Sequence, residues 1–353
     1  MMDGIAVRFD ALASGRRQFA IQGTLHAGDP VQMLTDDNNC IEVMTGCVLP
    51  RDSDCVIPVE RIAIAGSTAT IEEGYQTERH RFIHPQGSDH PGGQEVLRAG
   101  TGISPLDIAI LASCGLESVL VGKRPVVRVI STGNELIAPG KPVAEHQIRM
   151  SNGPALVAML SQQGFADTTH DHLVDEPAIL RERIGEHLQN ADVLILSGGV
   201  SMGKADFVPQ VLDDLGVRKV FHKISQRPGK PMWFGTGPGE QVVFALPGNP
   251  VSALVCCRQY IMPALLQATG RNKLPLEFVT LNEATTFNPP LTCFLPVRVS
   301  SQDDGKVSAT AVPTNTSGDF AALSGTDGYV ELAREKNEFP AGTIVPLHRW
   351  TSP

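Results

Sequence analysis

A loop of small residues that follows an apolar segment near the middle of the chain is the clearest sign of chemistry. Residues 193–196 are apolar and have the length and composition of a buried parallel strand. A strand, a glycine-rich turn and a helix start point backbone N–H groups at a phosphate or another oxyanion. A tight connection that uses its glycines only to turn the chain would have the same sequence pattern. The small residues of the loop are Ser197, Gly198, Gly199, Ser201 and Gly203.

Three acids stand near strand ends or helix starts. Asp206 comes directly after the glycine-rich loop, where an acid beside bound phosphate indicates a metal ion or a proton transfer. Glu135 ends the run Ser-Thr-Gly-Asn-Glu after another apolar strand, and we interpret it as a candidate magnesium ligand. The alternatives are a helix N-cap for Asp206 and an ordinary surface acid for Glu135. Asp175, before Glu-Pro, is itself typical of an N-cap that opens a helix.

Positive charge is concentrated in one short segment of an otherwise acidic chain. Lys223, Arg227 and Lys230 lie within eight residues, and Pro228 with Gly229 prevents a regular helix there. A loop that presents cations could clamp an oxyanion or a phosphate. A solvated basic loop is the alternative.

A third loop joins the strand predicted at 242–246 to the helix predicted at 251–268. Its two prolines restrict the backbone, which favours a shaped binding wall over an adaptable turn, although a rigid turn without a ligand remains open. Ligands of parallel sheets bind beyond the carboxyl ends of the strands, so the loops 131–135, 197–203 and 247–252 should converge on one crevice. The residues of the third loop are Pro247, Gly248, Asn249, Pro250 and Ser252.

The order of elements predicts a multidomain protein with α/β and β parts. Residues 1–75 alternate short β-like runs with turns, and Ser104 with Pro105 starts a helix that ends at Gly115. Strands alternate with helices from about residue 122, which predicts a largely parallel sheet. Short strands without a helical pattern then follow over 278–350 and predict a small β-barrel or sandwich.

Composition excludes several classes of function. A net charge of −9 argues against binding to nucleic acids or anionic membranes, and no apolar run approaches the length of a membrane span. No secretory signal is visible at the start, and the seven cysteines form no CxxC pair, so we expect reduced thiols and a cytoplasmic protein. His170 and His172 are expected on a surface strand, and we find neither a zinc motif nor a Ser-His-Asp arrangement.

Together, the ordered motifs resemble the molybdopterin molybdenumtransferases, the MoeA and gephyrin E-domain family. Shorter motifs toward both ends, such as Met2-Asp-Gly-Ile-Ala-Val-Arg8 and Thr316-Ser-Gly318, extend the resemblance over nearly the whole chain. The central motifs are Ser131-Thr-Gly-Asn-Glu135, Ser197-Gly-Gly-Val-Ser-Met-Gly203 with Asp206, Arg227-Pro-Gly-Lys-Pro231 and Leu246-Pro-Gly-Asn-Pro-Val-Ser252.

The resemblance implies the last step of molybdenum cofactor synthesis. Such enzymes cleave adenylylated molybdopterin with Mg²⁺, release AMP and leave molybdenum from molybdate on the dithiolene. It implies that Asp206 and Glu135 hold the metal, that Asp3, Thr45 and Asp175 are further catalytic positions, and that the small-molecule substrate binds the three loops. The implied substrate-binding residues are Thr132, Gly133, Ser197, Gly198, Gly199, Ser201, Gly203, Pro247, Gly248, Asn249, Pro250 and Ser252, and the implied molybdate ligands are Lys223, Arg227, Arg298 and Ser317.

Family members are elongated homodimers, so the resemblance implies that Asp3 and Thr45 reach the active site of a partner subunit. A molybdopterin adenylyltransferase is a further implied partner. The family usually has some tens of residues before the Asp3 motif, so we expect a shortened first domain. Asn134 stands where an acid is commoner and removes one possible metal ligand. Two alternatives remain open, namely molybdopterin adenylylation and a non-catalytic molybdopterin-binding scaffold.

The expected domains follow from these patterns and from the resemblance. They are a β-rich N-terminal domain (1–78), a linker and helical segment of the shortened first domain (79–121), a molybdopterin-binding α/β domain (122–273) and a C-terminal β-barrel (274–353).

Overall fold

The computed structural model describes residues 2–200, 207–273, 275–314, 316 and 318–351. The chain forms two compact units, residues 1–96 and 97–353, and each is described by itself. None of the helices in these ranges combines the length and apolar character that a membrane span requires.

The first unit is a six-stranded mixed sheet in the order β4-β1-β3-β2-β6-β5. Strand β1 is buried on both faces, because Ile5 packs into one apolar cluster and Ala6 into another on the opposite side. Short turns and one short helix connect the strands, as the predicted β-rich domain requires. The elements are β1 (Gly4–Val7), α1 (Phe9–Ala13), β2 (Gln18–Leu25), β3 (Asn39–Val43), β4 (Cys55–Pro58), η1 (Val59–Arg61), β5 (Ile62–Ala65) and β6 (Thr68–Ile71).

The centre of the second unit is a six-stranded sheet in the order β10-β7-β11-β15-β14-β12. Its first four strands are parallel. At the other edge, β14 pairs antiparallel with β15, and β12 pairs antiparallel with β14. Strand β11 is buried along its whole length, as its apolar run predicts. The strands are β7 (Val127–Thr132), β10 (Thr169–Leu173), β11 (Val193–Ser197), β12 (Arg218–His222), β14 (Trp233–Thr236) and β15 (Val242–Leu246), and a small pair is formed by β8 (Leu136–Ile137) and β9 (Ile148–Arg149).

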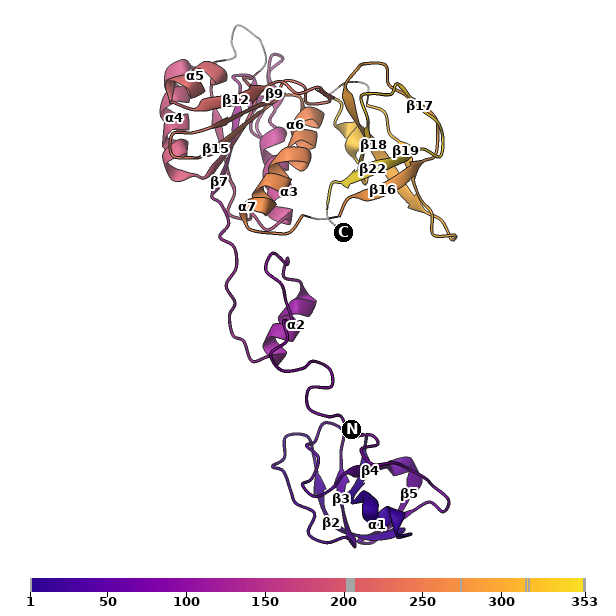
Figure 1. The fold of residues 1–353 in the computed structure, drawn as a ribbon. Coiled ribbons are helices and arrows are strands. Elements are labelled where there is room, and N and C mark those ends of the chain that lie inside the picture. Colours follow the sequence, from indigo (N-terminus) through magenta and orange to yellow (C-terminus); the bar gives the residue numbers. More distant parts are fainter. Residues whose placement is uncertain (1, 201–206, 274, 315, 317, 352–353) are drawn as a thin grey trace. The chain divides into compact units, whose positions relative to one another are not determined.

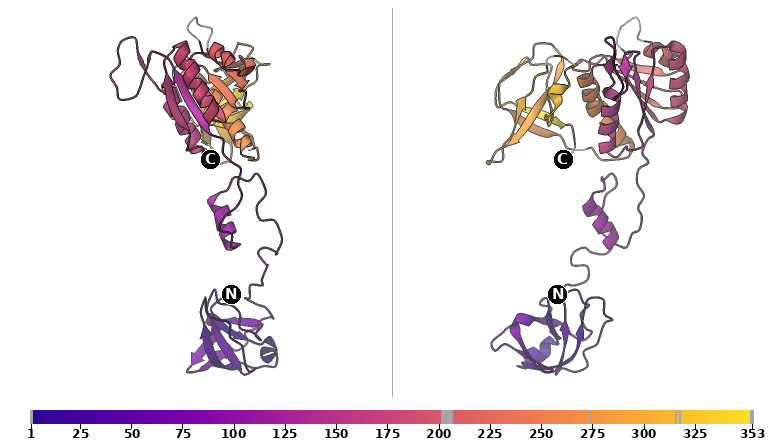
Figure 2. Two further views of the ribbon diagram at one scale, coloured as in Figure 1. Left: turned by 90° about the vertical axis from the view of Figure 1, so that its left-hand side faces the viewer. Right: turned by 180° about the vertical axis from the view of Figure 1, so that it is seen from behind.

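Helices cover both faces of this sheet. Figure 1 shows α4 and α5 on one face and α3, α6 and α7 on the other, and the view from behind in Figure 2 shows the same layers. The apolar clusters agree, since Leu194 and Leu196 face α4 and α5 whereas Ile195 faces α3 and α6. The helices are α2 (Pro105–Ser113), α3 (Asn152–Gln162), α4 (Pro177–Asn190), α5 (Val208–Asp214), α6 (Pro250–Cys256), the π-turn η2 (Cys257–Ile261) and α7 (Met262–Ala268).

A closed β-barrel completes the second unit and lies beside α6 (Figure 1). Strand β18 pairs with both β19 and β20, which closes the sheet and confirms the barrel rather than a sandwich. Its elements are β13 (Gln226–Arg227), β16 (Glu277–Leu281), β18 (Thr292–Ser301), β19 (Val307–Ala311), η3 (Ala321–Leu323), β20 (Gly328–Leu332) and β22 (Ile344–Arg349), with a separate pair β17 (Thr285–Thr286) and β21 (Glu338–Phe339).

Several local predictions are confirmed and others are wrong. Ser104 caps α2 with a capping box, as expected for the start of this helix. Leu106 in its first turn is 78 % exposed, and Leu111 is the only buried residue of the helix. Asp175 is not the N-cap of α4. Glu176 occupies that position in extended backbone, because a residue that precedes a proline avoids the helical region.

The helix predicted over 251–268 is interrupted by the π-turn η2. Pro263 has no N–H for the carbonyl of Gln259, and its ring would crowd that carbonyl in a regular helix. A widened turn directly before the proline relieves this conflict. The sequence pattern shows the proline but not how the helix accommodates it.

The parallel core should dominate the stability of the second unit. We expect Ile195→Ala, at a fully buried position of β11, to lower the free energy of unfolding by about 2–5 kcal/mol. Val220→Ala, at a position of β12 that is 53 % exposed, should change it by no more than about 0.5 kcal/mol. Urea unfolding followed by tryptophan fluorescence measures both, and equal losses would contradict this assignment of the core.

Candidate functional site

The three polar loops predicted to share a crevice meet, in their described parts, at the carboxyl ends of β7, β11 and β15. Asn152, at the first position of α3, joins two of them: its Nδ2 donates to Ser197 Oγ at 2.9 Å and to the carbonyl of Gly248 at 2.8 Å. The amide of Gly198 donates to the carbonyl of Leu246 at 3.2 Å. These converging loop ends, hereafter the crevice, come from strands that are distant in sequence.

Close packing at Gly198 joins the first loop to the second. A Cβ at this residue would lie 2.5 Å from the carbonyl oxygen of Thr132, and its φ of +103° also disfavours a side chain. Gly198 thus lets the chain after β11 lie against the end of β7. This is a more specific role than the turn that the sequence pattern indicates.

Two buried polar atoms at this crevice lack partners within the described residues. They are Thr132 Oγ1 and Asn152 Oδ1. Buried polar atoms are nearly always hydrogen-bonded, so unpaired ones mark places where a polar ligand can bind. The crevice therefore suits a ligand rich in donors and acceptors.

The loop that carries Glu135 is held by the strand beside it. The carbonyl of Gly133 can only accept, so His172 Nε2, 2.9 Å away, must donate to it. The amide of Gly133 donates to the carbonyl of Leu173 at 3.2 Å, and the amide of Asp175 donates to Asn134 Oδ1 at 3.0 Å. These bonds join the segments that carry two of the predicted catalytic acids.

The Glu135 carboxylate is exposed and has no partner in the part of the chain that the structure describes. Mg²⁺ is commonly bound by one or two carboxylates together with substrate phosphates rather than by a protein cage. Within the described ranges, no group of three or more His, Cys, Asp or Glu side chains is placed to hold a metal ion.

His170 and His172 were expected on a surface strand, and the structure puts them on an edge strand whose side chains are partly covered. Strand β10 is an edge strand, but both rings are half-buried on one face and bind the end of β7. His170 Nε2 lies 2.9 Å from Ser131 Oγ, and burial lowers the pKa of His170. Their spacing of two residues was the available signal, because it puts both rings on the same face of a strand.

The cationic loop is held in a demanding backbone conformation. Lys223 has a φ of +78°, which costs a side-chain-bearing residue energy and is concentrated at functional sites. The amide of Lys223 donates to the carbonyl of Met232, and that of Ile224 to the carbonyl of Lys230, both at 2.8 Å. The predicted loop is therefore a closed turn rather than a free basic segment.

Arg227 lines a cavity of about 240 Å³ between this loop and the barrel. It lies on β13, which pairs in parallel with β18, and Thr316 lies across the same cavity. Burial raises the pKa of Cys293, a further lining residue, to about 11, so its thiol is protonated and is no nucleophile near neutral pH.

Arg298 lies five positions beyond Cys293 on β18 and does not line the described part of that cavity. The structure thus places Arg227 and Arg298 on paired strands without bringing them into contact. Lys223, Arg227 and Arg298 share one property: within the described ranges, none of them forms an ion pair, whereas Arg61, Arg79, Arg183 and Arg349 do.

Asp3 and Thr45 are brought together in the first unit. Asp3 Oδ1 accepts from the Thr45 hydroxyl at 2.7 Å and from its amide at 2.5 Å, and these bonds lower the pKa of Asp3. Four predicted residues lie outside the described residues, namely Ser201, Gly203, Asp206 and Ser317.

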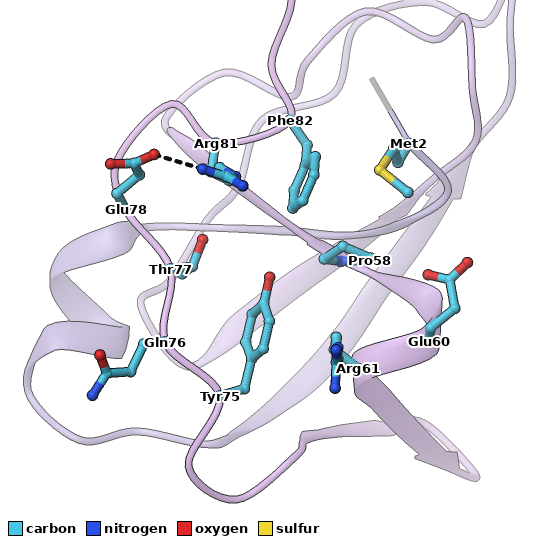
Figure 3. Close-up of a pocket in the computed structure, with 10 residues that line it drawn as sticks. All are labelled: Met2, Pro58, Glu60, Arg61, Tyr75, Gln76, Thr77, Glu78, Arg81 and Phe82. Atoms are coloured by element: carbon cyan, nitrogen blue, oxygen red, sulfur yellow. Dashed lines mark hydrogen bonds and ion pairs between the residues drawn. The ribbon is translucent and has the colours of Figure 1, made fainter.

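A larger pocket of about 640 Å³ lies on the first unit (Figure 3). Its two arginines already form ion pairs. Arg61 Nη1 lies 2.8 Å from Glu72 Oε2, and Arg81 Nη1 lies 2.9 Å from Glu78 Oε1. A polyanionic ligand would have to displace these acids, so this pocket fits the predicted chemistry less well than the crevice.

Asn152, Gln226 and Tyr260 are structural contributors that sequence reasoning missed. None of the three belongs to a motif that the sequence analysis singled out. Gln226 is 1 % exposed and lies directly before Arg227, so its place in the cationic loop was the only signal.

Three family models match successive parts of the chain. The model described as MoeA N-terminal region (domain I and II) matches residues 1–115, and the one described as a probable molybdopterin binding domain matches residues 128–267. The MoeA C-terminal region (domain IV) matches residues 279–350.

Curated proteins named molybdopterin molybdenumtransferase are similar over almost the whole chain. One from Synechocystis sp. is 38 % identical over 99 % of this chain and 87 % of its own length. One from Synechococcus elongatus is 32 % identical over 98 % of this chain and 86 % of its own. A crystal structure of a molybdopterin biosynthesis MoeA protein from Pyrococcus horikoshii superimposes with a TM-score of 0.80 at 26 % identity, covering 100 % of this chain and 87 % of that one.

The contact between Gly198 and Thr132 gives a direct test of how the crevice is assembled. We expect Gly198→Ala to lower the free energy of unfolding by about 2 kcal/mol or more, from a left-handed φ and from the collision with the carbonyl. Gly216→Ala is the matched control, because Gly216 has a φ of +77° but open space around it, and should cost about 1 kcal/mol. Equal losses in urea unfolding would rule out close packing at Gly198.

Proposed function

This chain belongs to the molybdopterin molybdenumtransferase family, and we propose that it transfers molybdenum from molybdate to adenylylated molybdopterin with magnesium-dependent release of AMP. The observation that carries the proposal is the crevice, where three polar loops meet in the range matched by the molybdopterin-binding model. We keep the division into domains 1–78, 79–121, 122–273 and 274–353 as part of this proposal.

The reaction must bring two polyanions together, and the crevice offers compensation for their charge. We propose that the pyrophosphate link of the substrate lies along the loops after β7, β11 and β15, near the exposed Glu135. When bound, Mg²⁺ would neutralise the phosphate oxygens of the bond that breaks. Glu135 and Asp206 would hold it from the protein side, and Asp175, joined to the Glu135 loop through Asn134, would help to orient that loop.

Molybdate would bind at the cationic loop and the neighbouring barrel. Lys223, Arg227 and Arg298 have no acidic partner in the described ranges, so their charge is available to an oxyanion. Ser317 is proposed as a fourth ligand from its motif position. The protein needs no nucleophile of its own for this reaction, and the protonated Cys293 thiol is consistent with that.

We also propose a homodimer. Residues 103–121 expose a run of apolar side chains, and Leu120 is fully exposed. Such a surface favours a protein partner, and a second copy of the chain is the partner that the resemblance implies. In that dimer, Asp3 and Thr45 would act at the active site of the partner subunit, and a molybdopterin adenylyltransferase would deliver the substrate.

The proposal is tested by AMP release from adenylylated molybdopterin in the presence of Mg²⁺, with and without molybdate. Molybdate-dependent release supports the transferase. Formation of adenylylated molybdopterin from ATP would instead indicate the adenylyltransferase, and binding without turnover would indicate a scaffold. In a transferase, Asp206→Asn should remove turnover, whereas a scaffold should keep its ligand unchanged.

Lys223→Ala should weaken the response to molybdate. Loss of one charge at an oxyanion pocket is expected to lower the molybdate-dependent rate by about 10²–10³-fold at fixed molybdate, while adenylylated molybdopterin still binds. Lys219→Ala, an exposed lysine on the neighbouring strand β12, is the control and should have wild-type rates. If substrate binding collapsed while the molybdate response stayed intact, the oxyanion assignment would be wrong.

Glu135→Gln keeps the shape of the side chain and removes its charge. We expect the Mg²⁺ concentration for half-maximal AMP release to rise by about 10–100-fold, and Mn²⁺ binding in the presence of substrate to weaken in parallel. Titration monitored by electron paramagnetic resonance measures the latter without turnover. Glu176→Gln, at an exposed position beside Asp175, should leave both unchanged, and a similar effect of the two substitutions would argue against a metal ligand at Glu135.

A further inference from the structure

The π-turn η2 joins the central sheet domain to the barrel and to the cationic loop through three consecutive residues. Arg258 Nε donates to the carbonyl of Arg349, the Tyr329 hydroxyl donates to Gln259 Oε1 at 2.9 Å, and the Tyr260 hydroxyl donates to Gln226 Oε1. A turn with i→i+5 hydrogen bonds has more residues per turn than an α-helix, so the rotation about the helix axis from one side chain to the next is smaller. This short turn therefore contacts both the barrel and the cationic loop.

Gln226 is the point where this turn reaches the cationic loop. Its side chain is buried, and its Nε2 donates to the carbonyl of Pro228 at 2.9 Å and faces Cys256 Sγ at 3.6 Å. A carbonyl can only accept, so the amide nitrogen must face Pro228 and the amide oxygen is left for Tyr260. Both ends of the carboxamide are thus engaged, and its orientation is determined.

The strand alternation of β13 turns this buried contact into a constraint on Arg227. Successive side chains of a strand point to opposite faces, so Gln226 points into the interior while Arg227 is exposed and lines the 240 Å³ cavity. The loop is also closely packed at Gly229. A Cβ at this residue would lie 2.5 Å from Cys256 Sγ and 2.7 Å from Gln226 Nε2. A displacement of Gln226 must therefore displace the loop.

We propose that Tyr260 and Gln226 are positioning residues that hold Arg227 for a tetrahedral oxyanion, which is molybdate if the proposed function is right. The pair acts through the backbone on either side of Arg227 and touches no substrate. Burial raises the pKa of Tyr260 to about 12, so the hydroxyl remains a neutral hydrogen-bond donor near neutral pH.

Tyr260→Phe removes the hydroxyl and leaves Gln226 Oε1 unpaired. We expect the KM for molybdate in AMP release to rise about tenfold, with kcat and the KM for adenylylated molybdopterin changed less than twofold. Calorimetric titration of the full chain with sodium molybdate alone should show the same loss of affinity. Amide hydrogen exchange over residues 223–231 should become faster.

Tyr329→Phe is the matched control. It removes a tyrosine hydroxyl that is bound to a glutamine of the same π-turn, but its bond leads into the barrel and not to the Arg227 loop. It should lower stability about as much as Tyr260→Phe and leave the affinity for molybdate unchanged. Gln226→Met keeps a similar volume and removes both polar contacts of the side chain. It should lower the affinity for molybdate as Tyr260→Phe does, and it serves as the test if Tyr260→Phe does not fold.

The outcomes separate this proposal from the proposed function. If the wild-type chain releases AMP in response to molybdate and Tyr260→Phe behaves like Tyr329→Phe, the positioning role is wrong and the transferase stands. If the wild-type chain releases no AMP but binds molybdate more tightly than Tyr260→Phe, the transferase is wrong and the positioning of Arg227 for an oxyanion stands. A wild-type chain that does not bind molybdate overturns both.

Discussion

The parallel pairing of β7, β11 and β15 is the constraint on which the crevice depends. In this register Ser197 lies beside Ser131 on one side and beside Leu246 on the other, so the three strands end at the same level. Loops that are far apart in sequence must then emerge at one edge of the sheet. Asn152 joins two of these loops with a single amide group, and the glycine after β11 provides the close approach to the third.

The cations of the loop before β14 and of β18 are not neutralised by acids in the part of the chain that the structure describes. The chain carries a net charge of −9, and several of its arginines are ion-paired, yet the cations of the loop before β14 and of β18 have no acidic partner in the described ranges. The left-handed backbone at Lys223 is unfavourable and must be compensated by the hydrogen bonds that close its loop. A pre-organised cationic site of this kind suits an anionic ligand better than a flexible basic segment would.

Much of the architecture could be predicted, because it depends on local patterns. Apolar runs of strand length that alternate with capped helices predicted the parallel sheet, and its convergent loops followed from the general geometry of such sheets. The barrel was expected from short strands and turns, although the sequence did not decide between a barrel and a sandwich. The cap of α4 was misplaced by one residue because Pro177 acts on the residue before it.

The sequence by itself determined that an apolar strand precedes each of the three polar loops, which loops carry glycine, acid or cation, and which family the motifs resemble, because these follow from residue type and spacing. Only the tertiary structure decided that His172 donates to the Gly133 carbonyl, that Asn152 joins two loops and that Tyr260 holds Gln226 beside Arg227. These contacts join residues 34 to 96 positions apart, and no periodic pattern records them. Their partners are selected by the packing of strands and helices, which brings distant side chains within hydrogen-bonding distance.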